Sequence, residues 1–215
     1  MNILVIAPHA DDEVLGCGGT ISRYAAEGHK IDLCITSKPH TPNWSEEYIR
    51  NREEEIKNVC KTLNINKVTV LDYKAALLGD VNHIDLNDKI RKVVEESNPD
   101  EIFIPFYGDL HKDHRVVAES CLVVLRPIEH KIRRILMYEI LSETEWGYTP
   151  FKPNIYIDIT NYINNKIEAM KHYKKEVKNT PHPRSIEGIK ALARKRGSEV
   201  NIVYAESFIL IREVI

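Results

Sequence analysis

The stretch that decides the fold of this chain is Ile3-Leu4-Val5-Ile6-Ala7, which runs directly into Pro8-His9-Ala10-Asp11-Asp12-Glu13. The apolar part shows no alternation with polar residues, which is typical of a strand covered on both faces in a parallel sheet. The polar part places an imidazole and three carboxylates at the end of that strand. Carboxylates this close repel one another unless a cation or a proton lies between them. The stretch therefore predicts a buried strand that leads into a cation site.

The rest of the chain repeats this alternation of strand and helix, with apolar runs between amphipathic segments of helical length. The predicted strands are Asn2–Ala7, Lys30–Thr36, Lys67–Leu71, Glu101–Pro105, Arg133–Tyr138, Asn154–Ile159 and Val203–Arg212. The predicted helices cover about 19–27, 46–63, 84–97, 112–125 and 160–174, with a last helix that ends near Gly197 as its C′ glycine. We expect a single domain over residues 1–215. Its fold would be α/β, a Rossmann-like three-layer sandwich with a mostly parallel sheet and a C-terminal elaboration.

The composition restricts the possible functions. The chain has 215 residues and a formal net charge of -2, so nothing favours binding to nucleic acid or to an anionic membrane. No apolar run is long enough for a membrane span, and no signal peptide is evident. The four cysteines are widely spaced without a C-x-x-C motif, which is typical of reduced thiols. We expect a cytoplasmic homo-oligomer that acts on a small molecule.

A second polar cluster, His111-Lys112-Asp113-His114, comes soon after the apolar strand Glu101–Pro105. Ligands bind at the carboxyl ends of the strands in such sheets, so the two clusters can meet there. His9, Asp12 and His114 would supply two imidazole nitrogens and one carboxylate, the ligand set of a catalytic zinc site with a position open for water. One histidine or aspartate at a strand end is usually an ordinary surface residue. Two such clusters together favour a metal-centred hydrolase.

The glycines Gly16-Cys17-Gly18-Gly19 invite comparison with a dinucleotide-binding loop. That interpretation fails because Ile21 stands where the motif needs its third glycine. The preceding acids would also repel a pyrophosphate. We therefore expect these glycines to permit a tight turn and close packing of the first helix.

The two polar clusters and the glycines resemble the motifs of a known family. Pro8–Glu13, followed by Gly16-x-Gly18-Gly19-Thr20, resembles the signature of the PIG-L/LmbE-like zinc-dependent de-N-acetylases. His111-x-x-His114 is similar to the second motif of that family. Weaker resemblances are Arg52 with Glu55, and Tyr204-Ala205-Glu206-Ser207-Phe208 near the C-terminus. The resemblance covers nearly the whole chain.

The resemblance implies a reaction and the residues that perform it. It implies a zinc ion held by His9, Asp12 and His114, with Asp11 as the general base. It also implies that His111 is a cationic group that stabilises the oxyanion or protonates the leaving amine. The implied enzyme is a metal-dependent amidohydrolase. It would remove an N-acetyl group from an N-acetylated amino sugar or sugar conjugate, releasing acetate and a free amine.

Four further residues have two interpretations each. Asp113 would act in catalysis by hydrogen-bonding an imidazole and fixing its tautomer, or it is an ordinary carboxylate in the first turn of a helix. Arg52 would bind a substrate hydroxyl or phosphate, or it pairs with Glu55 on an exposed helix face. His182 and Arg184 lie in a loop with two prolines before a helix. They would bind an anionic group of the substrate, or the loop is simply solvated.

Two other functions compete with the deacetylase. A metal-dependent phosphoesterase that acts on a small sugar or nucleotide phosphate is one, because acids at strand ends also hold magnesium or manganese. The two histidines favour zinc over these ions, and no phosphate-binding glycine loop is apparent. A catalytically silent sugar-binding protein is the other. Asp11 beside the inferred ligands argues against it, because binding alone needs no such base.

Overall fold

The computed structural model describes residues 1–128 and 132–215. In the described residues the strands form one sheet in the order β3-β2-β1-β4-β5-β7-β6. Strands β1 to β5 are parallel to one another, whereas β7 is antiparallel to both β5 and β6. The strands are β1 (Asn2–Ala7), β2 (Lys30–Lys38), β3 (Lys67–Lys74), β4 (Glu101–Pro105), β5 (Arg134–Tyr138), β6 (Ile155–Asp158) and β7 (Ala205–Glu213). The predicted mostly parallel sheet with a C-terminal elaboration is confirmed.

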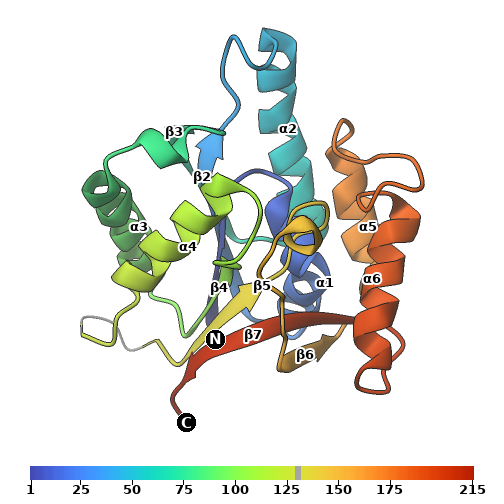
Figure 1. Cartoon of the computed structure of the whole chain (residues 1–215). Helices are drawn as coiled ribbons and strands as arrows, with labels where there is room; N and C mark the ends of the chain where they lie inside the picture. Colours follow the sequence, from blue (N-terminus) through green and yellow to red (C-terminus); the bar gives the residue numbers. More distant parts are fainter. Residues whose placement is uncertain (129–131) are drawn as a thin grey trace.

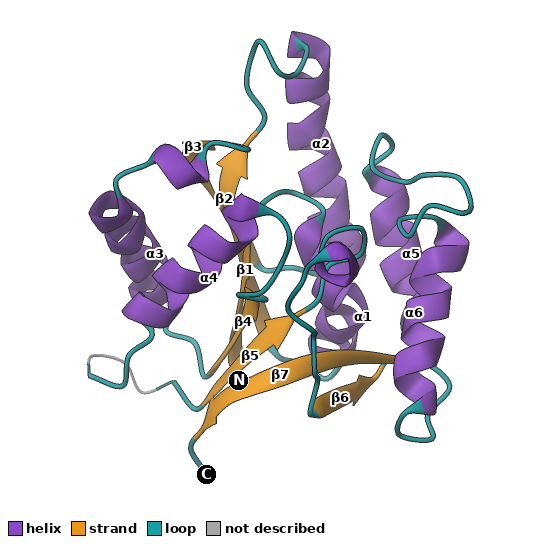
Figure 2. Cartoon of the chain, in the orientation of Figure 1, coloured by secondary structure: helices purple, strands orange, loops and turns teal. Residues whose placement is uncertain are grey.

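Helices cover both faces of this sheet and complete the three layers (Figures 1 and 2). The helices are α1 (Asp12–Ala26), α2 (Glu46–Leu63), α3 (His83–Ser97), α4 (Lys112–Val124), α5 (Ile163–His172) and α6 (Ile186–Ser198), with 3₁₀ turns η1 (Leu78–Asp80) and η2 (Thr144–Trp146). Helices α3 and α4 pack on one face, and α1, α2, α5 and α6 on the other. In the part of the chain that the structure describes, no helix is long and apolar enough to cross a membrane.

The first strand shows why its sequence contains no polar positions. Ile3 and Val5 belong to the core beneath α1, α2, α5 and α6, whereas Leu4 and Ile6 belong to the core beneath α3 and α4. Successive side chains of a strand point to opposite faces, so a strand between two helical layers must be apolar at every position. The sheet thus splits the core into two layers, and β1 is the middle one of the five parallel strands.

The start of the first helix corrects the prediction. Helix α1 begins at Asp12 and contains Gly16-Cys17-Gly18-Gly19, which we expected as a tight turn before a helix at about residue 19. A Cβ atom at Gly16 would overlap the ring of the buried Tyr138, so the glycine is needed for close packing. Glycine in a helix costs about 1 kcal/mol relative to alanine, and local propensity therefore favoured a turn. Tertiary packing outweighs that preference.

The end of α6 is a smaller correction. Gly197, expected just beyond the helix, lies within it, and Glu199 is the C-terminal cap. A Cβ atom at Gly197 would collide with the carbonyl oxygen of Ile202, so this glycine also serves close packing. The other predicted elements are confirmed, with ends that shift by no more than three residues.

A buried ion pair connects α1 to the C-terminal part of the chain. The carboxylate of Glu206, on β7, accepts the backbone N–H groups of Gly19 and Thr20 at 2.9 and 2.7 Å. Lys166, on α5, donates to Glu206 at 2.6 Å and to the carbonyl oxygen of Leu15 at 2.7 Å. An uninterrupted α-helix pairs the N–H of Gly19 with that same carbonyl. The ion pair is thus inserted into α1 and fixes the helix whose first turn carries the acidic cluster.

Candidate active site

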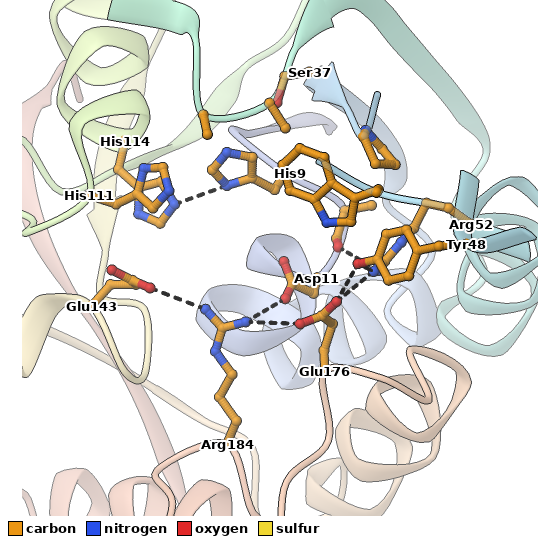
Figure 3. Close-up of a pocket in the computed structure, with 15 residues that line it drawn as sticks. His9, Asp11, Ser37, Tyr48, Arg52, His111, His114, Glu143, Glu176 and Arg184 are labelled. Carbon is orange, nitrogen blue, oxygen red and sulfur yellow. Dashed lines mark hydrogen bonds and ion pairs between the residues drawn. The ribbon is translucent and has the colours of Figure 1, made fainter. Parts of the chain in front are cut away.

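The two polar clusters meet at the carboxyl edge of the parallel strands, as expected. Strands β1 and β4 are neighbours, and the clusters follow them at the starts of α1 and α4. A pocket of about 190 Å³ opens there (Figure 3). Its ionisable and aromatic lining comprises His9, Asp11, Trp44, Tyr48, Arg52, His111, His114, Glu143, Glu176 and Arg184.

Three donor atoms at this pocket form a nearly equilateral triangle. His9 Nδ1 lies 3.2 Å from Asp12 Oδ2 and 3.2 Å from His114 Nε2. The third side, from His114 Nε2 to Asp12 Oδ2, is 3.3 Å. Ligand atoms about 2.0–2.2 Å from a zinc ion lie about 3.3–3.6 Å apart at the corners of a tetrahedron. The triangle therefore has the size of one face of a tetrahedral zinc site.

The outer nitrogens of the two imidazoles explain why a cation suits this triangle. His9 Nε2 lies 3.0 Å from Asp113 Oδ2, and His114 Nδ1 lies 3.3 Å from Asp109 Oδ1. Each carboxylate favours a proton on the nitrogen that faces it, so the nitrogens that face Asp12 are left as acceptors. Two nitrogen lone pairs and a carboxylate oxygen repel one another unless a cation or proton lies between them. The residues present therefore fit zinc.

The ionisation of the three residues follows the same electrostatics. Burial alone would lower the pKa of His9, but hydrogen bonds to Asp113 and Asp12 outweigh it and raise that pKa to about 9. Burial is likewise outweighed at His114, where Asp12 and Asp109 raise the pKa to about 10. Burial opposes ionisation of Asp12, but the adjacent imidazoles hold its pKa well below the usual value. The surroundings of the triangle thus favour positive charge.

His111 lies beside the triangle and makes different contacts. It is the N-cap of α4, where its Nδ1 accepts the backbone N–H of Asp113 at 3.1 Å. The proton of the neutral ring is therefore on Nε2. Its ring stacks on that of His114 with centroids 4.7 Å apart. Burial, followed by the positive charges of His114 and His9, lowers its pKa to about 4.

His111 is also an alternative third ligand to Asp12. His9, His111 and His114 each offer one nitrogen, and these atoms lie within 4.8 Å of one another. The Asp12 set is more compact, with no side longer than 3.3 Å. The shorter distances favour Asp12.

Asp11 occupies a strained position at the start of α1. Its φ of 135° lies in a region that non-glycine residues rarely adopt, and Ala76 and Ser142 beside the pocket also have positive φ. Its Oδ2 accepts a hydrogen bond from Arg184 at 2.8 Å. Burial and the charges of neighbouring carboxylates raise the pKa of Asp11 to about 7, although Arg184 opposes the shift. A strained, buried carboxylate that opens on the pocket is typical of a functional residue.

The residues proposed to bind substrate differ in position. Arg184 and Arg52 line the pocket, and Arg52 is only 5% exposed, so it does not lie on an exposed helix face. His182 does not line the pocket. Its Nδ1 instead accepts the backbone N–H of Arg184 at 3.1 Å, and its ring lies against Trp146. His182 therefore acts on the loop that carries Arg184 rather than on the pocket itself.

Several residues of the site are not predictable from the sequence motifs. Glu176 accepts hydrogen bonds from Tyr48 and Arg52, and Glu143 lies 3.5 Å from Arg184. These carboxylates follow α5 and β5, outside any motif, so no sequence signal identified them. Asp109 could have been found, because it is a carboxylate two residues before His111, a candidate catalytic residue.

The fold and the donor triangle define an α/β protein with a candidate metal centre at the carboxyl edge of its sheet. Residues 4–125, more than half of the chain, match the model of the PIG-L family, described as GlcNAc-PI de-N-acetylase. The chain belongs to this family.

Individual relatives are similar along most of the chain. The uncharacterized deacetylase YaiS of Escherichia coli K12 is 28% identical over 80% of this chain and 90% of its own length. A probable N-acetyl-alpha-D-glucosaminyl L-malate deacetylase 2 of Bacillus cereus is 24% identical over 79% of this chain and 80% of its own. The crystal structure of the conserved protein TT1542 from Thermus thermophilus superposes with a TM-score of 0.82. It is 26% identical and covers all of this chain and 96% of that one.

Proposed function

We propose that the chain is a zinc-dependent hydrolase that removes the N-acetyl group from an N-acetylated amino sugar or sugar conjugate. The family and the deacetylase relatives support hydrolysis of an N-acetyl amide. The observation that carries the proposal is the compact triangle of His9, Asp12 and His114, with the Asp11 carboxylate at the same pocket. A zinc ion held by this triangle would polarise the amide carbonyl and lower the pKa of the attacking water.

Asp11 is the proposed general base. The guanidinium of Arg184 holds its Oδ2 and thereby fixes the direction of the carboxylate. The carboxylate can then accept a proton from the attacking water. Asp11 is the residue just before the proposed ligand Asp12, but its carboxylate contacts Arg184 whereas that of Asp12 contacts the two imidazoles. Arg184 is thus a positioning residue for the base.

His111 is the proposed oxyanion donor, as a neutral ring rather than the cation that the resemblance implies, because burial and the neighbouring imidazoles lower its pKa to about 4. Its Nδ1 is used by the backbone N–H of Asp113, so Nε2 carries the proton that can be donated. That N–H group can donate a hydrogen bond to the oxyanion of the tetrahedral intermediate. The proton that Asp11 takes from the attacking water can then pass to the amine as the C–N bond breaks. Protonation of the amine is needed because an amide anion is a very poor leaving group.

The phosphoesterase alternative has less support. Phosphoryl transfer spreads charge over three oxygens, which enzymes commonly bind with lysine or arginine clamps. Lys112 is 64% exposed and points to Asp80, and Arg115 donates to the carbonyl oxygen of Asp109. Neither residue lines the pocket. The cations closest in sequence to the second cluster are therefore turned away from the site.

Measurement of acetate release from a panel of N-acetylated sugars tests the proposal. We expect the zinc-loaded protein to release acetate, and Asp11→Asn to keep its zinc but lose about 10²–10⁴-fold in kcat, as for other general bases. Asp88→Asn, a matched change at an exposed carboxylate of α3, should retain the full rate. A full rate for zinc-loaded Asp11→Asn would remove Asp11 from the mechanism. Magnesium-stimulated phosphate release without loss of acetyl groups would establish the phosphoesterase instead.

A further inference from the structure

The two guanidinium groups in the pocket are the obvious partners for an anionic substrate, but both are already paired. Arg184 Nη1 lies 2.8 Å from Asp11 and 3.5 Å from Glu176, and its Nη2 lies 3.5 Å from Glu143. Its Nε donates to the hydroxyl of Ser142 at 2.6 Å. Three carboxylates therefore surround one guanidinium (Figure 3).

Arg52 is satisfied in the same way. Its Nη2 lies 2.6 Å from Glu176 and also donates to the hydroxyl of Tyr48. Its Nη1 donates to the carbonyl oxygen of Ala10 at 3.0 Å, and its Nε lies 3.4 Å from Glu55. A substrate carboxylate would have to displace one of these partners, and the displaced carboxylate would lose its partner within a partly buried site.

Apart from the imidazoles of His9 and His114, which would be neutral as zinc ligands, the remaining lining of the pocket adds no positive charge for an anion. None of the described residues that line the pocket is a lysine, whereas three carboxylates line it, those of Asp11, Glu143 and Glu176. A bound zinc ion would add two positive charges to those of Arg52 and Arg184, and the carboxylates of Asp11, Asp12, Glu143 and Glu176 together would balance them. Pro39, Trp44 and Tyr48 add an uncharged part of the lining. Flat apolar rings suit the faces of a sugar.

We infer that the pocket selects electrically neutral N-acetyl glycosides and discriminates against those whose aglycone carries a carboxylate or phosphate. This inference rests on the proposed function and narrows its substrate class. Selectivity of this kind comes from like charges that face the wrong ligand, here Glu143 and Glu176. The relative from Bacillus cereus is named for a malate conjugate, which is a dianion. We expect this chain to prefer a neutral conjugate.

A matched pair of compounds tests the inference: N-acetyl-α-D-glucosaminyl L-malate and its dimethyl ester, which differ in the two carboxylate charges. We expect kcat/KM of the zinc-loaded protein to be at least about tenfold higher for the diester, which corresponds to about 1.4 kcal/mol. Equal values, or a preference for the malate, would overturn the inference and leave the proposed deacetylation intact.

Calorimetric binding of the same two compounds separates the inference from the proposed reaction. Tighter binding of the diester without acetate release would contradict the proposed function and support the inference. Binding of the malate at least as tightly as the diester, or no binding of either compound, would overturn the inference.

Two variants locate the source of the selectivity. Glu143→Gln removes one carboxylate from Arg184, and we expect kcat/KM for the malate to rise about tenfold relative to the diester. Glu168→Gln removes the same charge from an exposed position on α5, and its selectivity should equal that of the wild type. An unchanged ratio in Glu143→Gln would show that Arg184 and its carboxylates do not set the selectivity.

Discussion

Asp113 connects a proposed zinc ligand to the rest of the site. Its Oδ2 lies 3.0 Å from His9 Nε2 and accepts the backbone N–H of Ala76 at 2.6 Å. Its Oδ1 accepts the N–H of Leu78 at 3.1 Å. The carboxylate is therefore fixed by two backbone groups, and it in turn fixes the ring and the tautomer of His9. The sequence left open whether Asp113 was only a carboxylate in the first turn of a helix, and these contacts favour the role toward His9.

The substitution Asp113→Asn tests this role. We expect zinc affinity to fall about 10–100-fold, because residues that orient a ligand histidine have effects of this size. The dissociation constant can be measured by competition with a chromogenic chelator. Asp72→Asn, at a carboxylate that is 84% exposed, is the matched control and should bind zinc as the wild type does. Unchanged affinity in Asp113→Asn would show that His9 is held by other contacts.

The residues of the site differ in how far the sequence could predict them. His9, Asp12 and His114 belong to short motifs that follow strands, and the parallel sheet brings such positions together, as predicted. Glu176 and Arg184 come from the segment between α5 and α6. Their pairing with Arg52 and Asp11 depends on tertiary packing across more than a hundred residues. The same limit applies to His182. It lies only two residues before Arg184, and the conformation of the loop decides that Arg184 and not His182 lines the pocket.

At the scale of elements, α1 depends on the C-terminal strand for its position. Glu206 and Lys166 are 5% and 3% exposed, so the ion pair between them is almost fully buried. The carboxylate binds two N–H groups of α1, and the ammonium binds a carbonyl of the same helix. The segment around Glu206, which resembles a family motif, thus has a structural role. It holds the helix whose first residues form the site.

Removal of one partner should be far more destabilising than removal of both. We expect Glu206→Gln to lower the free energy of unfolding by about 3–5 kcal/mol, because Lys166 would remain buried without its counter-ion. The double variant Glu206→Gln with Lys166→Met should recover part of that loss. Urea denaturation of the two single variants and the double variant measures this coupling. Strictly additive losses would show that the two residues act independently.

The elements themselves were predictable where one physical signal dominated. Runs rich in apolar residues identified the strands. The helix predicted over residues 46–63 has these ends in the structure, and Ser45 is its N-cap. The start of α1 was wrong because glycine disfavours a helix locally. This local preference is outweighed by the close approach of Gly16 to Tyr138. Tyr138 belongs to β5, so the contact cannot be read from the sequence around Gly16.

At the scale of the whole molecule, the chain order of the strands places the site. From β1 the chain continues to β2 and β3 on one side, and then returns to β4 on the other side of β1. Connections therefore leave β1 and its neighbour β4 in opposite directions, which opens a crevice at the carboxyl ends of these two strands. Both polar clusters follow these strands. The elaboration between α5 and α6 then contributes Glu176 and Arg184 to the pocket.

This arrangement joins distant parts of the chain through the proposed zinc ligands, so zinc should stabilise the whole fold. A ligand that binds only the native state raises the free energy of unfolding by about 2.7 kcal/mol at a concentration of 100 times its Kd. For a chain of this length that corresponds to an increase in Tm of about 5–10 °C. Thermal unfolding followed by circular dichroism, with zinc and then with a chelator, measures the shift.

The variants show whether the stabilisation comes from the proposed site. Zinc also binds the cysteines and histidines of an unfolded chain, which would reduce the increase in Tm. His114→Ala keeps all four cysteines, so its comparison with the wild type isolates the contribution of the native site. We expect its Tm to be insensitive to zinc, whereas His83→Ala, at an exposed histidine on α3, should show the full increase. An equal increase in His114→Ala and in the wild type would place the bound zinc outside the triangle, because a site that has lost one of three ligands cannot retain the same affinity.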